Sequence, residues 1–203
     1  MMPIEIIKIK KEGDRYVLHL SNDDTLSLKE SVFVRHNLYK GKVIDEDQIV
    51  AIVFDSARQD GIDLALKKLT NRKTESEIRT ILSSEDFDEE VTDEVVDYLS
   101  EYGFIDDEAY ALLFCRDKRN INGYGPVKIA YILRQKGIDN ETIARGLEEY
   151  TPEIEIEMIE SIVEKKYLRD GILVKEREKI IRFLLSRGFH YNEIKEVLNR
   201  WKN

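Results

Sequence analysis

The sequence lacks the features that are typical of secreted and membrane proteins. It has one cysteine, so no disulfide can form within the chain. Its longest unbroken apolar run, Ala109–Cys115, is far shorter than the roughly 20 residues that a membrane-spanning helix needs. The first residues lack the basic and apolar stretches that are typical of a signal peptide. We therefore expect a soluble, cytoplasmic protein without a membrane segment.

Proline and glycine are also scarce, with 3 and 10 copies in 203 residues, whereas 36% of the residues are charged. The net charge of -9 argues mildly against a simple nucleic-acid binder. The acidic excess is uneven, because residues 61–108 carry a net -10 while residues 109–150 and 151–203 carry +2 and +1. Two interpretations remain open: the acidic helix faces are simply solvated, or the molecule presents oppositely charged faces to a partner that carries both signs of charge.

Alternating apolar residues between two turns predict β-structure at the start of the chain. Isoleucines and leucines alternate with other residues over 4–28, and Gly13-Asp14 and Asn22–Asp24 interrupt the pattern. This spacing is typical of a three-stranded antiparallel meander. Beyond residue 29 the period becomes helical, which predicts a short helix that ends near Gly41.

Helix signals then continue to the end of the sequence. Asp45 can cap a longer helix, which Gly61 is expected to interrupt. From Gly61 onward no strand pattern appears. Four further helix starts are marked by a Thr74–Glu77 capping box, by Asp88, by Asp106 and by Gly125-Pro126.

The helical part repeats itself at an offset of 51 residues. Residues 128–147 align without a gap on residues 179–198 with six identities in 20 positions, where about one is expected by chance. The identical pairs are Lys128/Lys179, Ile129/Ile180, Leu133/Leu184, Gly137/Gly188, Ile143/Ile194 and Leu147/Leu198. The same shift backwards places Ile78 and Leu82 on Ile129 and Leu133, with Asp86 where the other copies have glycine.

These patterns predict a mainly α-helical fold with a small N-terminal antiparallel β meander. Residues 1–60 would hold the meander and its helices. Three tandem three-helix repeats would follow: repeat one over 61–105, repeat two over 106–151 and repeat three over 152–203. Because a unit of this length buries its apolar face poorly alone, we expect the repeats to stack into an elongated, curved array. The alternative is one ordinary helical bundle with accidental internal similarity.

No residue pattern indicates an enzyme, a metal site or a cofactor. The three histidines are scattered, and Gly123–Pro126 lacks the lysine and hydroxyl residue of a phosphate-binding loop, so it is better explained as a turn that starts a helix. Asp106-Asp107 most simply caps a helix. Cys115, which lies in an apolar run, is expected in the core.

The candidate partner-binding residues are basic and lie in repeats two and three. They are Arg116, Lys118, Arg119, Tyr124, Lys128, Arg134, Lys136, Lys179, Arg182 and Arg187. Cations near a helix C-terminus interact favourably with its dipole, which could explain Arg116–Arg119 without a partner. The alternative is a positive surface with an exposed tyrosine that stacks on a base or packs on a protein. In repeat three, the basic residues form a second cluster of Lys175, Arg177, Lys179, Arg182 and Arg187. Trp201 is expected to close the last core, and the alternative is an exposed anchor.

One combination of residues resembles a known family. It is made of Phe104–Ala111, Phe114–Arg116, Gly123–Pro126, Lys128-Ile129, Leu133 and Lys136–Ile138, with Leu69, Arg72, Thr74, Glu77–Arg79 and Leu82 upstream and Leu184, Arg187–Phe189 and Ile194 downstream. Together these residues are similar to the RecX family, bacterial regulators of the RecA recombinase. The resemblance covers residues 65–200, and Asp86 departs from the expected glycine.

The resemblance implies three tandem three-helix repeats, no catalytic activity and binding to the RecA filament on single-stranded DNA. It further implies inhibition of the ATPase and strand exchange of RecA, in homologous recombination, DNA repair and the SOS response. We expect a monomer without cofactors. A second hypothesis is a helical-repeat module that binds single- or double-stranded DNA directly, since three-helix units resemble helix-turn-helix domains. The sequence leaves filament capping and destabilisation of the filament interior equally open.

Overall fold

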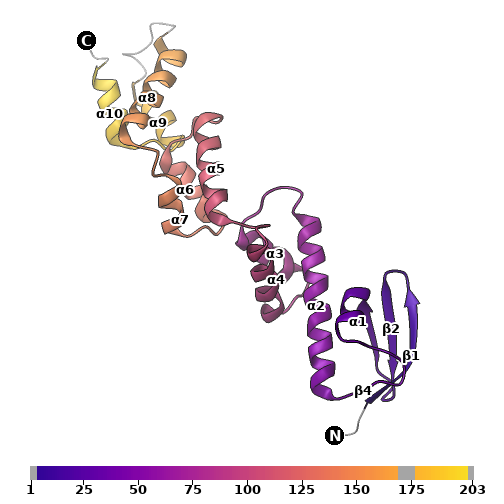
Figure 1. Cartoon of the computed structure of the whole chain (residues 1–203). Coiled ribbons are helices and arrows are strands. Elements are labelled where there is room, and N and C mark those ends of the chain that lie inside the picture. Colours follow the sequence, from indigo (N-terminus) through magenta and orange to yellow (C-terminus); the bar gives the residue numbers. More distant parts are fainter. Residues whose placement is uncertain (1–3, 169–176, 201–203) are drawn as a thin grey trace. The chain divides into compact units, whose positions relative to one another are not determined.

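The computed structural model describes residues 4–168 and 177–200 (Figure 1). Lys175 and Trp201, to which the sequence assigned roles, lie outside the described residues. The chain forms two compact units. The N-terminal unit comprises Met1–Asn71 and Ile78–Ile105, and the C-terminal unit comprises Arg72–Glu77 and Asp106–Asn203. The domain boundaries expected at residues 60, 105 and 151 stay predictions.

The predicted meander is confirmed, with one additional strand. The elements at the start of the chain are β1 (Ile4–Glu12), β2 (Arg15–Leu20), β3 (Thr25–Lys29), α1 (Glu30–Arg35) and β4 (Val43–Ile44). They form an antiparallel sheet in the order β3-β2-β1-β4. Strand β4 was not predicted, because two residues are too few to show an alternating pattern. Helix α1 ends at Arg35, well before the predicted Gly41.

Apolar side chains of the sheet and of two helices make the first core. Ile6, Leu18 and Leu28 are buried together with Val32 of α1 and Ile52 of the next helix. Tyr16 stacks on Phe33 with ring centroids 4.4 Å apart. One face of the sheet is therefore fixed by helix packing, as expected for alternating strands.

Helix α2 (Glu46–Lys68) is continuous, so the predicted interruption at Gly61 is wrong. Its start is as predicted, since Asp45 and Gln48 form a capping box. Gly61 is instead a packing residue: a Cβ atom there would lie 2.9 Å from Cγ2 of Val95. Because Ile62 and Ala65 beyond it are buried in a second core, the apolar contacts outweigh the low helix propensity of glycine. The first half of α2 thus packs on the sheet and the second half on repeat one.

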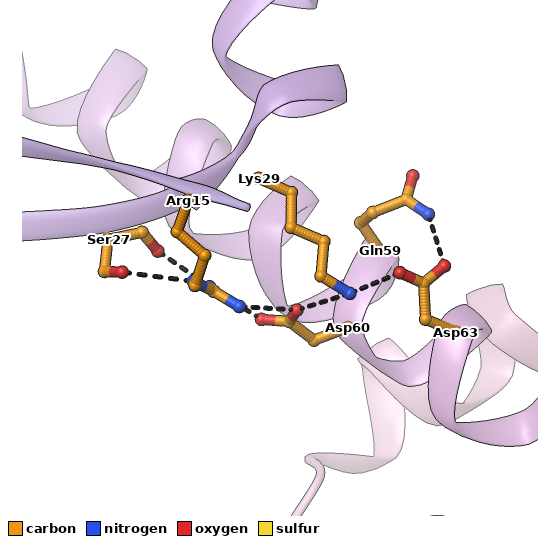
Figure 2. A network of polar contacts seen from close by, with 6 residues as sticks. All are labelled: Arg15, Ser27, Lys29, Gln59, Asp60 and Asp63. Carbon is orange, nitrogen blue, oxygen red and sulfur yellow. Dashed lines mark hydrogen bonds and ion pairs between the residues drawn. The ribbon is translucent and has the colours of Figure 1, made fainter. Parts of the chain in front are cut away.

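A polar network also ties the sheet to α2 (Figure 2). The guanidinium of Arg15 donates two hydrogen bonds of 2.9 and 3.0 Å to the carboxylate of Asp60. The ammonium of Lys29 lies 3.1 Å from the same carboxylate and also binds Asp63. Burial alone would raise the pKa of Asp60, but hydrogen bonds from the two cations outweigh it and hold that pKa below its usual value.

Repeat one contains α3 (Glu75–Ser84) and α4 (Glu89–Glu101). The predicted capping box is confirmed, with 3.0 Å from the Thr74 amide to Oε2 of Glu77 and 3.3 Å from the Glu77 amide to Oγ1 of Thr74. Asp88 occupies the cap position of α4 as predicted, although its side chain makes no capping hydrogen bond.

The remaining described elements are helical. They are α5 (Asp107–Asn120), α6 (Pro126–Gln135), α7 (Asn140–Gly146), α8 (Pro152–Val163), the π-helical turn η1 (Glu164–Leu168), α9 (Arg177–Ser186) and α10 (Tyr191–Arg200). The predicted starts at Asp106 and at Gly125-Pro126 are confirmed. Helices α6 and α9 begin and end 51 residues apart, and α7 and α10 begin 51 residues apart, so the repeat found in the sequence is a repeat of structure.

The turn after the first repeated helix is the same in all three copies. Gly137 and Gly188 have φ of 80° and 86°, and Asp86 takes φ of 61° at the same place. The following amide returns to the helix in each case, at 3.2 Å from Phe87 to Leu82, 3.1 Å from Ile138 to Leu133 and 3.2 Å from Phe189 to Leu184. Aspartate tolerates this left-handed conformation better than most residues, so the substitution leaves the turn intact.

Candidate protein-interaction surface

All ten predicted partner-binding residues lie in the C-terminal unit. Four of them are exposed on α5, α6 and α9, namely Arg116, Arg134, Lys179 and Arg182. The other six are half-buried and contact neighbouring parts of the unit, namely Lys118, Arg119, Tyr124, Lys128, Lys136 and Arg187. The prediction therefore combines two kinds of residue, four that are exposed and six that are half-buried.

Arg119 contacts neighbouring parts of its own unit and has a structural role. Its side chain is only 18% exposed. It donates to the Glu149 carbonyl at 3.4 Å, lies 4.0 Å from the Glu149 carboxylate and covers the Tyr150 ring at 5.9 Å. These contacts join the end of α5 to the segment that follows α7, which explains the burial of this cation.

Lys136 holds the end of α6 against the start of α3. Its ammonium lies 2.7 Å from Glu77, and its carbonyl accepts a 2.7 Å hydrogen bond from Oγ1 of Thr74. Burial opposes the charge of Lys136, but its interactions with Glu77 and Tyr110 together outweigh this effect and raise the pKa of the lysine. Burial also acts against the Glu77 carboxylate, but hydrogen bonds from Lys136 and from the Thr74 amide lower the pKa of Glu77.

Arg187 plays the corresponding part at the end of α9. Its guanidinium donates to the carbonyls of Asn122 and Gly123 at 2.6 and 3.2 Å. Its own carbonyl accepts a 2.8 Å hydrogen bond from the Gly125 amide. The next carbonyl, of Gly188, accepts from the Val127 amide at 3.0 Å. Four hydrogen bonds thus attach repeat three to the start of α6.

The two contacts are the same joint, shifted by 51 residues. In the first joint Thr74 meets Lys136, and in the second Gly125 meets Arg187. The left-handed glycine beyond each cation is pressed against the partner segment: a Cβ at Gly137 would collide with Ser76, and one at Gly188 with Lys128. The joint was not predicted, because its two sides are about 60 residues apart and local periodicity carries no signal for such pairs.

Replacing Glu77 by glutamine is expected to weaken the first joint selectively. Glutamine keeps the capping box but loses the ion pair with Lys136, which should lower the free energy of unfolding by about 0.5–1 kcal/mol at neutral pH. Because the folded pKa of Glu77 is lowered, this difference should vanish as the pH falls through that pKa. Urea unfolding at two pH values measures it. The control is Glu148→Gln at an exposed position, and equal losses in both variants would contradict the assignment.

The half-buried lysines lie over aromatic rings. Nζ of Lys128 is 4.2 Å from the Tyr124 ring centroid, and Nζ of Lys118 is 5.1 Å from that of Phe114. The Tyr124 carbonyl accepts a 2.9 Å hydrogen bond from the Tyr150 hydroxyl. Tyr124 is therefore held in place with one face covered by a cation, rather than projecting freely as a stacking platform.

Glu155, His190 and Glu193 are the one group of potential metal ligands found among residues 4–168 and 177–200. Glu155 is buried and accepts hydrogen bonds from the His190 amide and from Nδ1 of His190. His190 directly precedes α10, so the negative carboxylate of Glu155 interacts favourably with the positive N-terminal end of that helix. This cap accounts for Glu155 and His190, whereas Oε2 of Glu193 is buried without a hydrogen-bond partner among the described residues. Sequence reasoning missed it because Glu155 and His190 are 35 residues apart.

The cysteine lies in the core as predicted. Cys115 is buried beside Ala111 and Ile129, and burial raises the pKa of its thiol to about 11. The thiol is therefore protonated at neutral pH and is a poor nucleophile. Among the helices of the described residues, none combines the length and apolarity that crossing a membrane requires.

Comparison with known proteins places the chain in one family. The family model of the second three-helix domain of RecX matches residues 106–147, and that of the third three-helix domain matches residues 153–198. The regulatory protein RecX of Clostridium acetobutylicum is 34% identical over 196 residues, which cover 93% of this chain and 91% of that protein. That of Leuconostoc mesenteroides is 30% identical and covers 98% of this chain, while this chain covers 76% of it.

Two solved structures are similar to the fold. A crystal structure of a regulatory protein RecX matches with a TM-score of 0.76 and 30% identity, covering 97% of this chain and 99% of the other. The crystal structure of RecX from Lactobacillus salivarius matches with a TM-score of 0.65 and 28% identity, covering 71% of this chain and 96% of the other.

Proposed function

Since this chain belongs to the RecX family, we propose that it is a non-enzymatic regulator that binds the RecA recombinase filament and lowers its ATPase and strand-exchange activities. The observation that carries the proposal is a similarity to regulatory proteins that extends over nearly the whole length of both chains. In this proposal the chain acts in the cytoplasm as a monomer, in recombination, DNA repair and the SOS response.

The chemistry of the described residues supports a binding role rather than a catalytic one. The Cys115 thiol is buried and protonated, Asp106 accepts a hydrogen bond from the Ala109 amide, and Glu155 caps α10. Each of these side chains already has a structural task. In contrast, the cations Arg116, Arg134, Lys179 and Arg182 are exposed, so an acidic partner surface can reach them without unfolding any element.

An ATPase assay tests the proposal. Adding the full chain to RecA on single-stranded DNA should lower the rate of ATP hydrolysis progressively, up to equal amounts of the two proteins. An unchanged rate with folded chain in excess would rule the proposal out.

A second titration tests direct DNA binding, which the exposed cations of the C-terminal unit also favour. In it the chain is added to single-stranded and duplex DNA without recombinase. Affinity for bare DNA that falls steeply with salt, and that charge reversal at Lys128 and Arg134 abolishes, would favour a DNA-binding module. The net charge of -9 makes the protein partner the better-supported choice.

A further inference from the structure

The loop between α5 and α6 presents an apolar side chain to solvent. Ile121 is 77% exposed, the largest exposed fraction among the large hydrophobic residues that the structure describes. It follows the last turn of α5, and its amide donates a 2.8 Å hydrogen bond to the Asp117 carbonyl. Single exposed apolar residues are common, so exposure alone assigns no role to Ile121. The backbone of this loop is the second observation.

Nearly every backbone amide and carbonyl of this loop makes a hydrogen bond. The amides of Gly123 and Tyr124 donate to the backbone carbonyls of Arg119 and Lys118 at 3.1 and 3.0 Å. The carbonyls of Asn122 and Gly123 accept from Arg187, and that of Tyr124 accepts from the Tyr150 hydroxyl. A loop with so many satisfied groups is rigid. The exposed side chain of Ile121 therefore sits on a fixed support and loses little backbone entropy on binding.

Four cations lie close to this loop. Lys118 and Arg119 lie in the last turn of α5, Lys128 covers the Tyr124 ring, and Arg187 bonds the loop from repeat three. Two exposed carboxylates lie near them, that of Asp117 on α5 and that of Glu149, which pairs with Arg119. An apolar side chain within a mostly positive rim is complementary to an apolar recess with a negative rim.

We propose that Ile121 is the apolar anchor of the docking surface for the protein partner, and that Arg187 is a positioning residue that fixes the anchor loop. The partner site is an apolar recess bordered by carboxylates. Isoleucine has no ring to stack on a base, so a protein fits this surface better than single-stranded DNA. The inference rests on the proposed function and adds to it the point of contact.

The test compares Ile121→Ser with Val50→Ser in the full chain. Val50 is 68% exposed on α2, in the other unit, so both variants lose an exposed aliphatic side chain and should fold. Binding to RecA filaments on single-stranded DNA is measured by titration. Ile121→Ser should raise the dissociation constant by at least about tenfold, as expected for a central anchor, and Val50→Ser by less than about twofold.

The outcomes separate the two proposals. Equal affinities of Ile121→Ser and the unsubstituted chain would overturn the anchor and leave the proposed function intact. No binding by the unsubstituted chain would overturn both. Loss of affinity for bare DNA in Ile121→Ser would overturn the assignment to a protein partner.

Arg187 is tested by a double-mutant cycle with Ile121. If Arg187 acts by holding the loop, Arg187→Gln should weaken filament binding in the unsubstituted chain but add little in the Ile121→Ser background. A loss of affinity that adds fully to that of Ile121→Ser would overturn the positioning role. Simple destabilisation of the fold would not produce this coupling, and far-ultraviolet circular dichroism checks that each variant is folded.

Discussion

Replacing Gly188 by alanine is expected to lower the free energy of unfolding of the C-terminal unit by about 3–5 kcal/mol. Two effects combine at this residue. Its φ of 86° is in the left-handed region, where a Cβ atom costs about 1–2 kcal/mol. The added atom would also collide with the backbone nitrogen and Cβ of Lys128, at the joint between repeats two and three. Since backbone cannot rotate aside, the joint must open or shift.

Gly103 offers a matched control for this substitution. It also follows a helix in a left-handed conformation, with φ of 69°, but nothing lies within 4 Å of where its Cβ would be. Gly103→Ala should therefore show only the conformational cost, about 1–2 kcal/mol. Urea unfolding followed by circular dichroism measures both variants. Similar losses in Gly188→Ala and Gly103→Ala would show that close packing at the joint contributes nothing.

Replacing Asp60 by asparagine should detach the electrostatic link between the sheet and α2. The substitution keeps the size of the side chain and removes the charge that Arg15 and Lys29 share. Hydrogen bonds to charged groups contribute about 1.5–3 kcal/mol each when they are protected from water. With 30% of the Asp60 side chain exposed, we expect a total loss of about 2–3 kcal/mol in the N-terminal unit.

The pH dependence provides a second measurement of the same link. The folded pKa of Asp60 is lowered, so its contribution is complete above the pKa of an unfolded aspartate, about 3.9. The contribution is lost as the pH falls through the folded pKa. The difference in unfolding free energy between the original chain and Asp60→Asn should therefore shrink below pH 3.9. A difference that stays constant with pH would contradict the role of the charge.

Asp93 provides the control for the Asp60 substitution. It pairs with Arg79 at 2.6 Å in the same unit, but its side chain is 54% exposed. Exposed pairs contribute about 0–1 kcal/mol, so Asp93→Asn should have a much smaller effect than Asp60→Asn. Hydrogen exchange of the β2 and β3 amides adds a local measurement, because only Asp60→Asn is expected to accelerate it.

Local chemistry made much of this fold predictable from the sequence. The alternation over residues 4–28, the capping box at Thr74 and the proline at the start of α6 each depend on neighbours within a few positions. The repeat was also visible, since equal positions in stacked units need similar residues. Asp86 shows the limit of such matching, because a different residue supports the same turn.

What the sequence could not reveal depends on distant partners. Glycine usually interrupts a helix, so the sequence alone marks Gly61 as a break. Only the close approach of Val95 shows that Gly61 is a packing residue. By sequence, three residues belong to basic clusters, namely Arg119, Lys136 and Arg187. In the folded chain, Arg119 pairs with Glu149 and Lys136 with Glu77, while Arg187 donates to two loop carbonyls. A count of charges cannot distinguish a cation that binds a partner from one that joins two repeats.

The two joints have equivalent backbones but different side chains. Glu77 faces Lys136 in the first, while Lys128, at the corresponding place in the second, turns to the Tyr124 ring and leaves Arg187 to bridge two carbonyls. A duplication of repeat two would place Lys128 opposite a new copy of Lys136. That junction would bring two ammonium groups together without a guanidinium to bridge the carbonyls. The side chains at each junction therefore fit only the present order of the repeats. Growth of the chain by duplication of a repeat would require compensating substitutions at the new junction.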